Sequence, residues 1–159
     1  MTMGTNDYPF NRLYQYIKND PLYRDDRCEW FVQSGAASID EKPACGTVST
    51  LIPRADMETL VQNSALVISH CGIGSLNLML KYRKRTIFVP RVSQHGEFSD
   101  DHQLQIAQEI NNQRMDVILP EQSFPNLDYQ ALCDEPVAAT AVDITNYHLA
   151  RIIEYKLTG

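Results

Sequence analysis

The sequence predicts an α/β protein built on a Rossmann-like parallel sheet with helices on both faces. Short apolar segments alternate with amphipathic segments of helical spacing along the chain, as in proteins made of βαβ units. Two of the apolar segments, ALVIS (65–69) and TIFVP (86–90), are hydrophobic at nearly every position, which is typical of parallel strands buried on both faces. The length of 159 residues fits one domain covering residues 1–159.

The first predicted elements are a short strand over residues 1–3 and an amphipathic helix over residues 7–20. We expect Asp7 to cap this helix and Pro9 to lie in its first turn. Its apolar residues fall at i, i+3, i+4 and i+7, and they are Phe10, Leu13, Tyr14 and Ile17.

The remaining elements follow from the same patterns. The predicted strands cover residues 28–35, 47–53, 65–69, 86–90 and 115–120. The predicted helices cover residues 55–64, 73–82, 100–113 and 143–157. Residues 121–140 contain two prolines and are expected to be irregular.

Ligands of such sheets bind beyond the carboxyl ends of the strands. The loops that follow the predicted strands are therefore the candidate binding segments. They are residues 4–6, 33–35, 70–75 and 91–102.

The loop at residues 69–75 has two possible interpretations. Gly72 and Gly74 would let a ligand approach the backbone, and the helix that follows offers free N–H groups, to which the Ser75 hydroxyl adds a further donor. This arrangement suits a diphosphate, but a tight strand-to-helix turn also needs glycine. The dinucleotide fingerprint is absent because position 77 is Asn, and there is no Gly-Lys-Ser/Thr of a P-loop.

The polar segment 91–103 also has two possible interpretations. It contains two histidines near carboxylates, which could indicate a metal site, whereas a solvated loop with Ser99 or Asp100 capping the next helix explains the same residues. We favour the loop and expect no metal. His102 and Gln103 begin the helix, so they can point into the crevice beside loop 69–75 and hydrogen-bond a ribose or phosphate.

Composition excludes some classes of protein. A net charge of −6 argues against a nucleic-acid partner, which would require a basic surface. The four cysteines have wide, irregular spacings that do not suit zinc and suggest a reducing, cytoplasmic compartment. No apolar segment approaches the ~20 residues that span a bilayer. Any membrane contact is expected to be peripheral or through a partner.

Three segments resemble a known family. GTNDYPFNRL (4–13), ADMETLVQNSALVISHCGIGSLNLML (55–80) and TIFVPRVSQHGEFSDDHQLQIAQEI (86–110) are together similar to the glycosyltransferase family 28 C-terminal domain. The likeness runs over roughly residues 3–112. It is strongest to small stand-alone catalytic subunits, namely the PssE type of bacterial exopolysaccharide synthesis and the dolichol-pathway two-subunit GlcNAc-transferase, and it extends to the C-terminal half of MurG.

The resemblance implies a donor-binding half of a GT-B glycosyltransferase. The donor would be a UDP-sugar, and the acceptor a lipid-linked saccharide held by a second, membrane-anchored subunit, because this chain is too short for both halves. Transfer would be inverting, without metal or cofactor, and the protein would be peripheral at the cytoplasmic face of a membrane through its partner. Exopolysaccharide, capsule or glycolipid biosynthesis would be the setting.

The resemblance also implies a set of donor-binding residues. Gly72, Gly74 and Ser75 match the diphosphate loop, and the strand end at Ile52 matches the segment that lines the uracil. The full set is Gly4, Thr5, Ile52, His70, Gly72, Gly74, Ser75, Arg91, Asp101, His102 and Gln103.

Two positions qualify these expectations. Many relatives have an acidic residue that binds the ribose where this chain has Leu78, so that Asn77, Asp101 or His102 would take over that contact, or donor binding would be weaker. The general base is expected in the partner chain, with His70 as a weaker candidate that more plausibly orients the loop or contacts phosphate.

The alternative function is a non-catalytic regulatory or scaffold partner that retains the fold, which Leu78 favours. An unrelated nucleotide-binding oxidoreductase is disfavoured by the glycine pattern.

Overall fold

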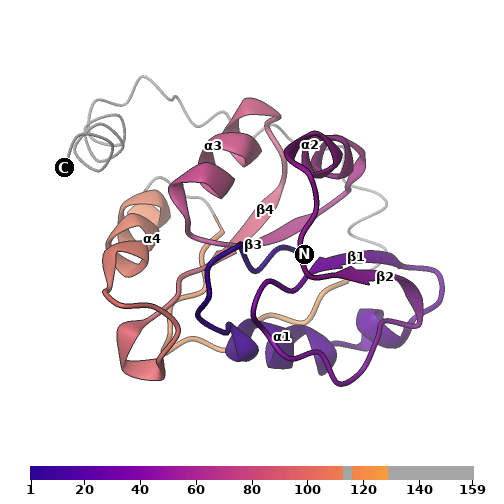
Figure 1. Cartoon of the computed structure of the whole chain (residues 1–159), viewed down its shortest axis with the longest axis horizontal. Helices are drawn as coiled ribbons and strands as arrows, with labels where there is room; N and C mark the ends of the chain where they lie inside the picture. Colours follow the sequence, from indigo (N-terminus) through magenta and orange to yellow (C-terminus); the bar gives the residue numbers. More distant parts are fainter. Residues whose placement is uncertain (113–115, 129–159) are drawn as a thin grey trace.

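The computed structural model describes residues 1–112 and 116–128, and the sheet at its centre consists of two parallel strand pairs. In the first pair, β1 (Glu29–Gln33) lies beside β2 (Cys45–Ser49), and in the second, β3 (Val67–His70) lies beside β4 (Thr86–Val89). Figure 1 shows the two pairs with the N-terminus between them. All four were expected as strands, although β2 begins and ends before the predicted bounds of 47–53.

The N-terminal residues join the two pairs into one sheet. Thr2 makes parallel bridges to Gln33 of β1 and to Ser69 of β3. At the other edge, Val117 makes a parallel bridge to Phe88 of β4. The spatial order is therefore β2, β1, the N-terminal segment, β3, β4 and the segment at Val117, which is a doubly wound, Rossmann-like order.

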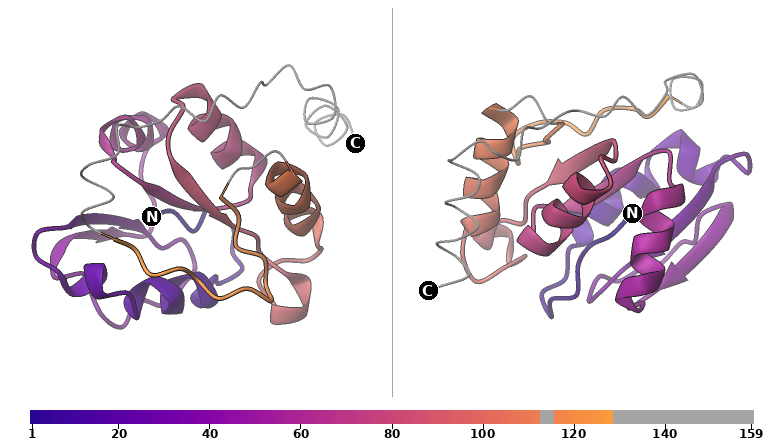
Figure 2. Two further views of the ribbon diagram at one scale, coloured as in Figure 1. Left: turned by 180° about the vertical axis from the view of Figure 1, so that it is seen from behind. Right: turned by 90° about the horizontal axis from the view of Figure 1, so that it is seen from above.

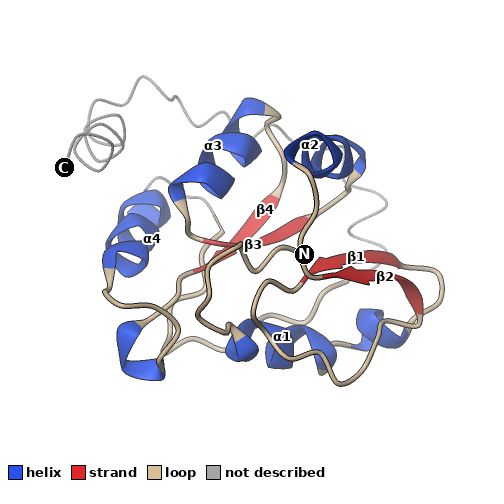
Figure 3. Ribbon diagram, viewed as in Figure 1, coloured by secondary structure: helices blue, strands red, loops and turns tan. Residues whose placement is uncertain are grey.

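Within the described residues, four α-helices accompany the sheet. They are α1 (Asn11–Lys18), α2 (Arg54–Asn63), α3 (Ile73–Lys81) and α4 (His102–Asn112). Figure 3 colours helices blue. Two short 3₁₀ helices, η1 (Pro21–Arg24) and η2 (Ser93–His95), lie in the connections. The strands β1 and β2 are joined by residues 34–44 without a helix.

Strand alternation divides the core into two layers, one on each face of the sheet. Phe88 packs with Val61 of α2, Leu76 of α3 and Ile106 of α4 on one face. Ile87 and its alternate neighbour Val89 face the other way, into a cluster that includes the buried residues of α1. The two opposite views confirm α2 and α3 on one side and α1 on the other (Figures 1 and 2). The predicted fold class is therefore confirmed.

The prediction for the start of the first helix was wrong. The helix begins at Asn11, its N-cap is Phe10, and no side chain caps it, so Asp7 and Pro9 lie before it. Phe10 is fully buried at this entry point. The observed helix boundary therefore coincides with the burial of this aromatic ring. The polar capping pattern had placed the boundary earlier in the chain.

The remaining predictions concern the C-terminal part of the chain. Of the strand predicted over 115–120, the described residues 116–120 contain the single bridge at Val117. Residues 121–128 contain no strand or helix, as expected, whereas 129–140 and the helix predicted over 143–157 lie outside the described residues. Within 1–112 and 116–128, no helix is long and apolar enough to cross a membrane.

Candidate functional site

A cavity of ≈ 600 Å³ opens at the carboxyl ends of the central strands. Gly4 and Thr5, which follow the N-terminal segment, line it together with His70 at the end of β3. The first turn of α3 contributes Gly74 and Ser75. Here the chain order reverses, since β1 lies on one side of the N-terminal segment and β3 on the other. Such a switch point is where open α/β sheets bind ligands.

A second cavity of ≈ 480 Å³ lies at the opposite end of the sheet. It is lined by the beginnings of β1 and β3, including Glu29 and Val67, and by apolar residues of α2 such as Leu60. This end of a parallel sheet lacks the strand-end loops and helix N-termini that bind ligands. We therefore assign the candidate functional site to the cavity at the carboxyl ends.

The first turn of α3 offers unused hydrogen-bond donors to this cavity. Gly72 is the N-cap, and no side chain caps the helix. The amide of Leu76 bonds to the Gly72 carbonyl, so the amides of Ile73, Gly74 and Ser75 precede the first intrahelical bond. These N–H groups and the positive end of the helix dipole favour an anion.

The glycines around the cavity have different physical roles. A Cβ on Gly74 would have no atom within 4 Å, so packing does not require glycine there. A Cβ on Gly72 would lie 2.5 Å from His70 Nε2, and a Cβ on Gly4 would lie 2.8 Å from the same atom. Gly4 also has a φ of +84°, which other residues rarely adopt. Gly4 and Gly72 are therefore needed to seat the His70 ring, whereas the open space at Gly74 is available to a ligand.

His70 is held as a neutral side chain. Its pKa is lowered to about 4, first by burial and then by the positive charge of Arg91 and the nearby His102. Its Nδ1 is buried without a hydrogen-bond partner in the described part of the chain. A neutral imidazole beside the cavity can donate or accept one hydrogen bond to a ligand, but it is a weak base at neutral pH.

The His70 pKa predicts acid sensitivity. Because the folded pKa of about 4 lies below the unfolded value of 6.5, the unfolded chain takes up this proton first. The free energy of unfolding therefore falls as pH drops from 6.5 towards 4, with His70 contributing up to about 3 kcal/mol. The measurement is chemical denaturation of wild type and His70→Asn across this range. We expect the variant to lose less stability on acidification, and equal pH slopes in the two proteins would contradict it.

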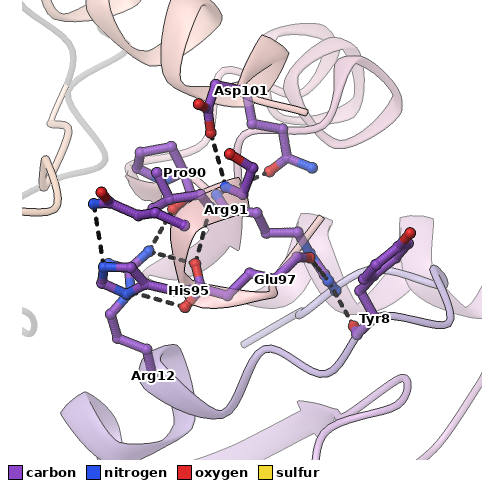
Figure 4. Close-up of polar contacts among 11 residues, drawn as sticks. Tyr8, Arg12, Pro90, Arg91, His95, Glu97 and Asp101 are labelled. Carbon is purple, nitrogen blue, oxygen red and sulfur yellow. Dashed lines mark hydrogen bonds and ion pairs between the residues drawn. The ribbon is translucent and has the colours of Figure 1, made fainter. Parts of the chain in front are cut away.

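Five predicted site residues do not line the cavity, namely Gly72, Arg91, Asp101, His102 and Gln103. Figure 4 shows where Arg91 and Asp101 lie. Arg91 is 1% exposed, and its backbone amide bonds to Gln103 Oε1 at 3.3 Å. Asp101 accepts the Ser93 amide at 2.8 Å, and His102 contacts Asp100 through Nδ1. Asp100 also accepts the His102 amide at the start of α4. The Asp100 carboxylate thus accepts the first amide of α4, whereas Asp101 is the residue directly before the helix.

The expectation of a solvated loop at 91–101 was wrong for part of its length. Arg91, Val92 and Glu97 are buried. Glu97 pairs with Arg12 and accepts the Val92 amide, so it is committed to structural contacts. Among residues 1–112 and 116–128, no group of three His, Cys, Asp or Glu side chains could hold a metal ion.

Thr2, Arg54 and Lys81 line the cavity but were not predicted from the sequence. Thr2 and Gln33 both line the cavity and are buried, and Thr2 Oγ1 donates to Gln33 Oε1 at 2.6 Å. Two cations, Arg54 and Lys81, reach its rim from α2 and α3, and both pair with Glu58. Helical spacing gave no sign of these cations at the cavity, because the relative placement of α2 and α3 brings them there. Gln33, the last residue of β1, lies in the segment 33–35 that was expected to be a candidate binding segment.

Leu78 and Asn77 both line the cavity. Leu78 is half-buried and packs against the apolar cluster under α3, while Asn77 is exposed. Ile52, which was expected near the uracil of the donor, also lines the cavity. The cavity thus unites Gly4, Thr5, Ile52, His70, Gly74 and Ser75 of the predicted set, and their roles stay predictions.

A comparison with protein families identifies the family of this chain. The family model for the glycosyltransferase family 28 C-terminal domain matches residues 31–132, which include the end of β1, the loop before α3 and α4. No curated protein and no solved structure matches the chain. With this match over more than half its length, and with a Rossmann-like sheet carrying a cavity at its switch point, the chain belongs to the glycosyltransferase family 28 C-terminal domain family.

Proposed function

We propose that this chain is the donor-binding and catalytic subunit of a two-component inverting glycosyltransferase. It would transfer a sugar from a UDP-sugar to a lipid-linked saccharide in exopolysaccharide, capsule or glycolipid biosynthesis. Family membership supports glycosyltransferase activity in general. The resemblance to small stand-alone subunits is the support for the two-component arrangement and for the acceptor.

The observation that carries the proposal is the open space beside Gly74, in the first turn of α3, where no side chain caps the helix. A diphosphate placed there would accept hydrogen bonds from the amides of Ile73, Gly74 and Ser75. Fixed N–H donors stabilise the charge that develops on a leaving diphosphate, so this mechanism requires no cation. Ile52 would lie beside the uracil of the donor.

The general base of the reaction would come from outside this chain. The base must take a proton from the acceptor hydroxyl, and its pKa should lie near the working pH. A pKa of about 4 makes His70 poorly suited to this task. We therefore assign His70 to the donor and expect the acceptor side, with its base, on a membrane-anchored partner at the cytoplasmic face.

Isothermal titration calorimetry of the purified chain tests donor binding. We expect UDP and UDP-sugars to bind with micromolar to submillimolar affinity, and cytidine diphosphate, which shares the diphosphate, to bind more weakly. Chelating divalent metal should leave the affinity unchanged, because backbone amides hold the diphosphate. Absence of measurable UDP affinity, even with the partner present, would contradict the enzymatic proposal.

A second candidate function is a non-catalytic regulator or scaffold of a partner glycosyltransferase. Leu78 favours it, since an apolar side chain replaces a ribose-binding carboxylate and packs partly into the core. In this case the chain would raise the activity or stability of its partner without affinity for UDP. Activity of the complex with a Gly74 variant separates the two functions, because a scaffold would keep full activity.

A further inference from the structure

We propose that Arg91 is a positioning residue that holds the N-terminal loop, defined as residues 4–7, in the shape that the donor needs. The proposal rests on the proposed function, since Gly4 and Thr5 of this loop line the cavity. Sequence resemblance suggested that Arg91 contacts the donor directly. Its side chain instead acts beneath the site, on the backbone.

One guanidinium group binds both ends of the N-terminal loop. Arg91 Nη2 donates to the Met3 carbonyl at 2.6 Å, immediately before the loop. Arg91 Nη1 donates to the Tyr8 carbonyl at 2.6 Å, immediately after it, and to the Glu97 carbonyl at 2.7 Å. Figure 4 shows the guanidinium meeting Glu97 and Tyr8. The group is also 5.0 Å from the Phe10 ring centroid, a cation–π distance.

Between these two anchors, the loop begins at Gly4, whose amide donates to Thr2 Oγ1 at 3.3 Å. Thr5 and Asp7 are exposed, and within the loop the Tyr8 amide bonds to Asn6 Oδ1. Gly4 has the left-handed φ of +84° that turns the chain over His70. Fixing the carbonyls on both sides of this turn restricts the conformations open to the loop. A loop ordered before the ligand arrives does not lose that freedom on binding.

Arg91 can serve as an anchor because its own position is fixed. It follows β4, and its amide is held by Gln103 of α4. Glu97, which receives the guanidinium through its carbonyl, is itself paired with Arg12 of α1. The segment from Arg91 to Gln103 therefore links the N-terminal loop to two helices. This assigns Gln103, too, to support of the site rather than to the ligand.

The geometry requires arginine and not only a positive charge. A planar guanidinium presents donors in fixed directions that reach three carbonyl groups at once, whereas a lysine ammonium is a compact point charge on a flexible stem. Arg91→Lys keeps the charge and is the test variant, with Arg91→Met as the stronger change. Arg12→Met is the matched control, because Arg12 belongs to the same buried network but makes no bond to Met3 or Tyr8.

The experiment combines calorimetry with hydrogen exchange of the full chain. Relative to wild type, we expect Arg91→Lys to raise the Kd for UDP by about tenfold and to speed amide exchange in residues 4–8. Arg12→Met should lower the melting temperature but change the Kd by less than about twofold. If Arg91→Met fails to fold, Arg91→Lys still decides, since it preserves the buried charge.

The outcomes separate the two proposals. A wild-type chain without UDP affinity overturns the proposed function. A wild-type chain that binds UDP, with equal affinity and equal exchange in Arg91→Lys, overturns the positioning role alone. An equal loss of affinity in Arg91→Lys and Arg12→Met also overturns it, because the effect would then be general destabilisation. Loss confined to the Arg91 variants, with faster exchange at residues 4–8, supports it.

Discussion

The Gly74→Asp variant is expected to lose UDP binding by about a thousandfold while keeping its fold. A Cβ at this position meets no atom within 4 Å, so the substitution causes no clash. An acidic residue in the first turn of a helix is favourable for the free protein. Beside a bound diphosphate, however, two negative charges about 4 Å apart repel by roughly 4 kcal/mol at the effective dielectric constant near a protein surface, which is about a thousandfold in Kd.

Calorimetry of Gly74→Asp and Gly74→Asn measures this effect. Asparagine has nearly the same size as aspartate but no charge, so the difference between the variants isolates repulsion from steric exclusion. We expect Asn to bind UDP more tightly than Asp, and both variants to melt within a few degrees of wild type. Normal UDP binding by Gly74→Asp would place the diphosphate elsewhere.

The Glu97→Ala variant is expected to lose about 3–5 kcal/mol of unfolding free energy. The Glu97 carboxylate accepts from Arg12 Nε at 2.9 Å and Nη2 at 2.8 Å, and from the Val92 amide at 2.9 Å. The two side chains of the pair are only 13% and 4% exposed. Removing the carboxylate leaves a guanidinium charge and an amide buried without their acceptor, which costs far more than the pair contributes.

Urea denaturation followed by circular dichroism measures the loss at Glu97. Arg24→Ala is the control, since it removes an ion pair to Glu41 whose side chains are 63% and 40% exposed. Exposed pairs of this kind contribute less than about 1 kcal/mol. A Glu97→Ala variant as stable as Arg24→Ala would show that water reaches the pair and that the network does not anchor the segment after β4.

The elements with one dominant pattern were predicted correctly from the sequence. β3 and β4 are buried on both faces, so their apolar runs had no competing interpretation. The start of α1 was placed too early, because Asp7 and Pro9 fit a helix start while burial of Phe10 depends on tertiary packing. Local pattern fails where packing against distant residues sets a boundary.

The cavity was located correctly by topology, but its supporting contacts were not. The rule that parallel sheets bind ligands beyond their strand ends directed attention to Gly4, His70 and Gly74. The sequence around Arg91 and Glu97 is polar, and nothing in it signals burial. Their partners are far along the chain, as in the pairs of Arg91 with Met3 and of Glu97 with Arg12. Such contacts leave no local periodicity.

The position of Thr2 between β1 and β3 has a consequence for how the protein folds. Thr2 makes backbone bridges to Gln33 and to Ser69, which both lie far along the chain. Pairing between segments far apart in sequence is slow, because the entropy of closing the intervening loops is lost before the contacts form. The bridges of Thr2 to Gln33 and to Ser69 are therefore expected to form late in folding. The cavity lies at the carboxyl ends of β1, the N-terminal segment and β3. It is therefore complete only once the N-terminal residues have entered the sheet.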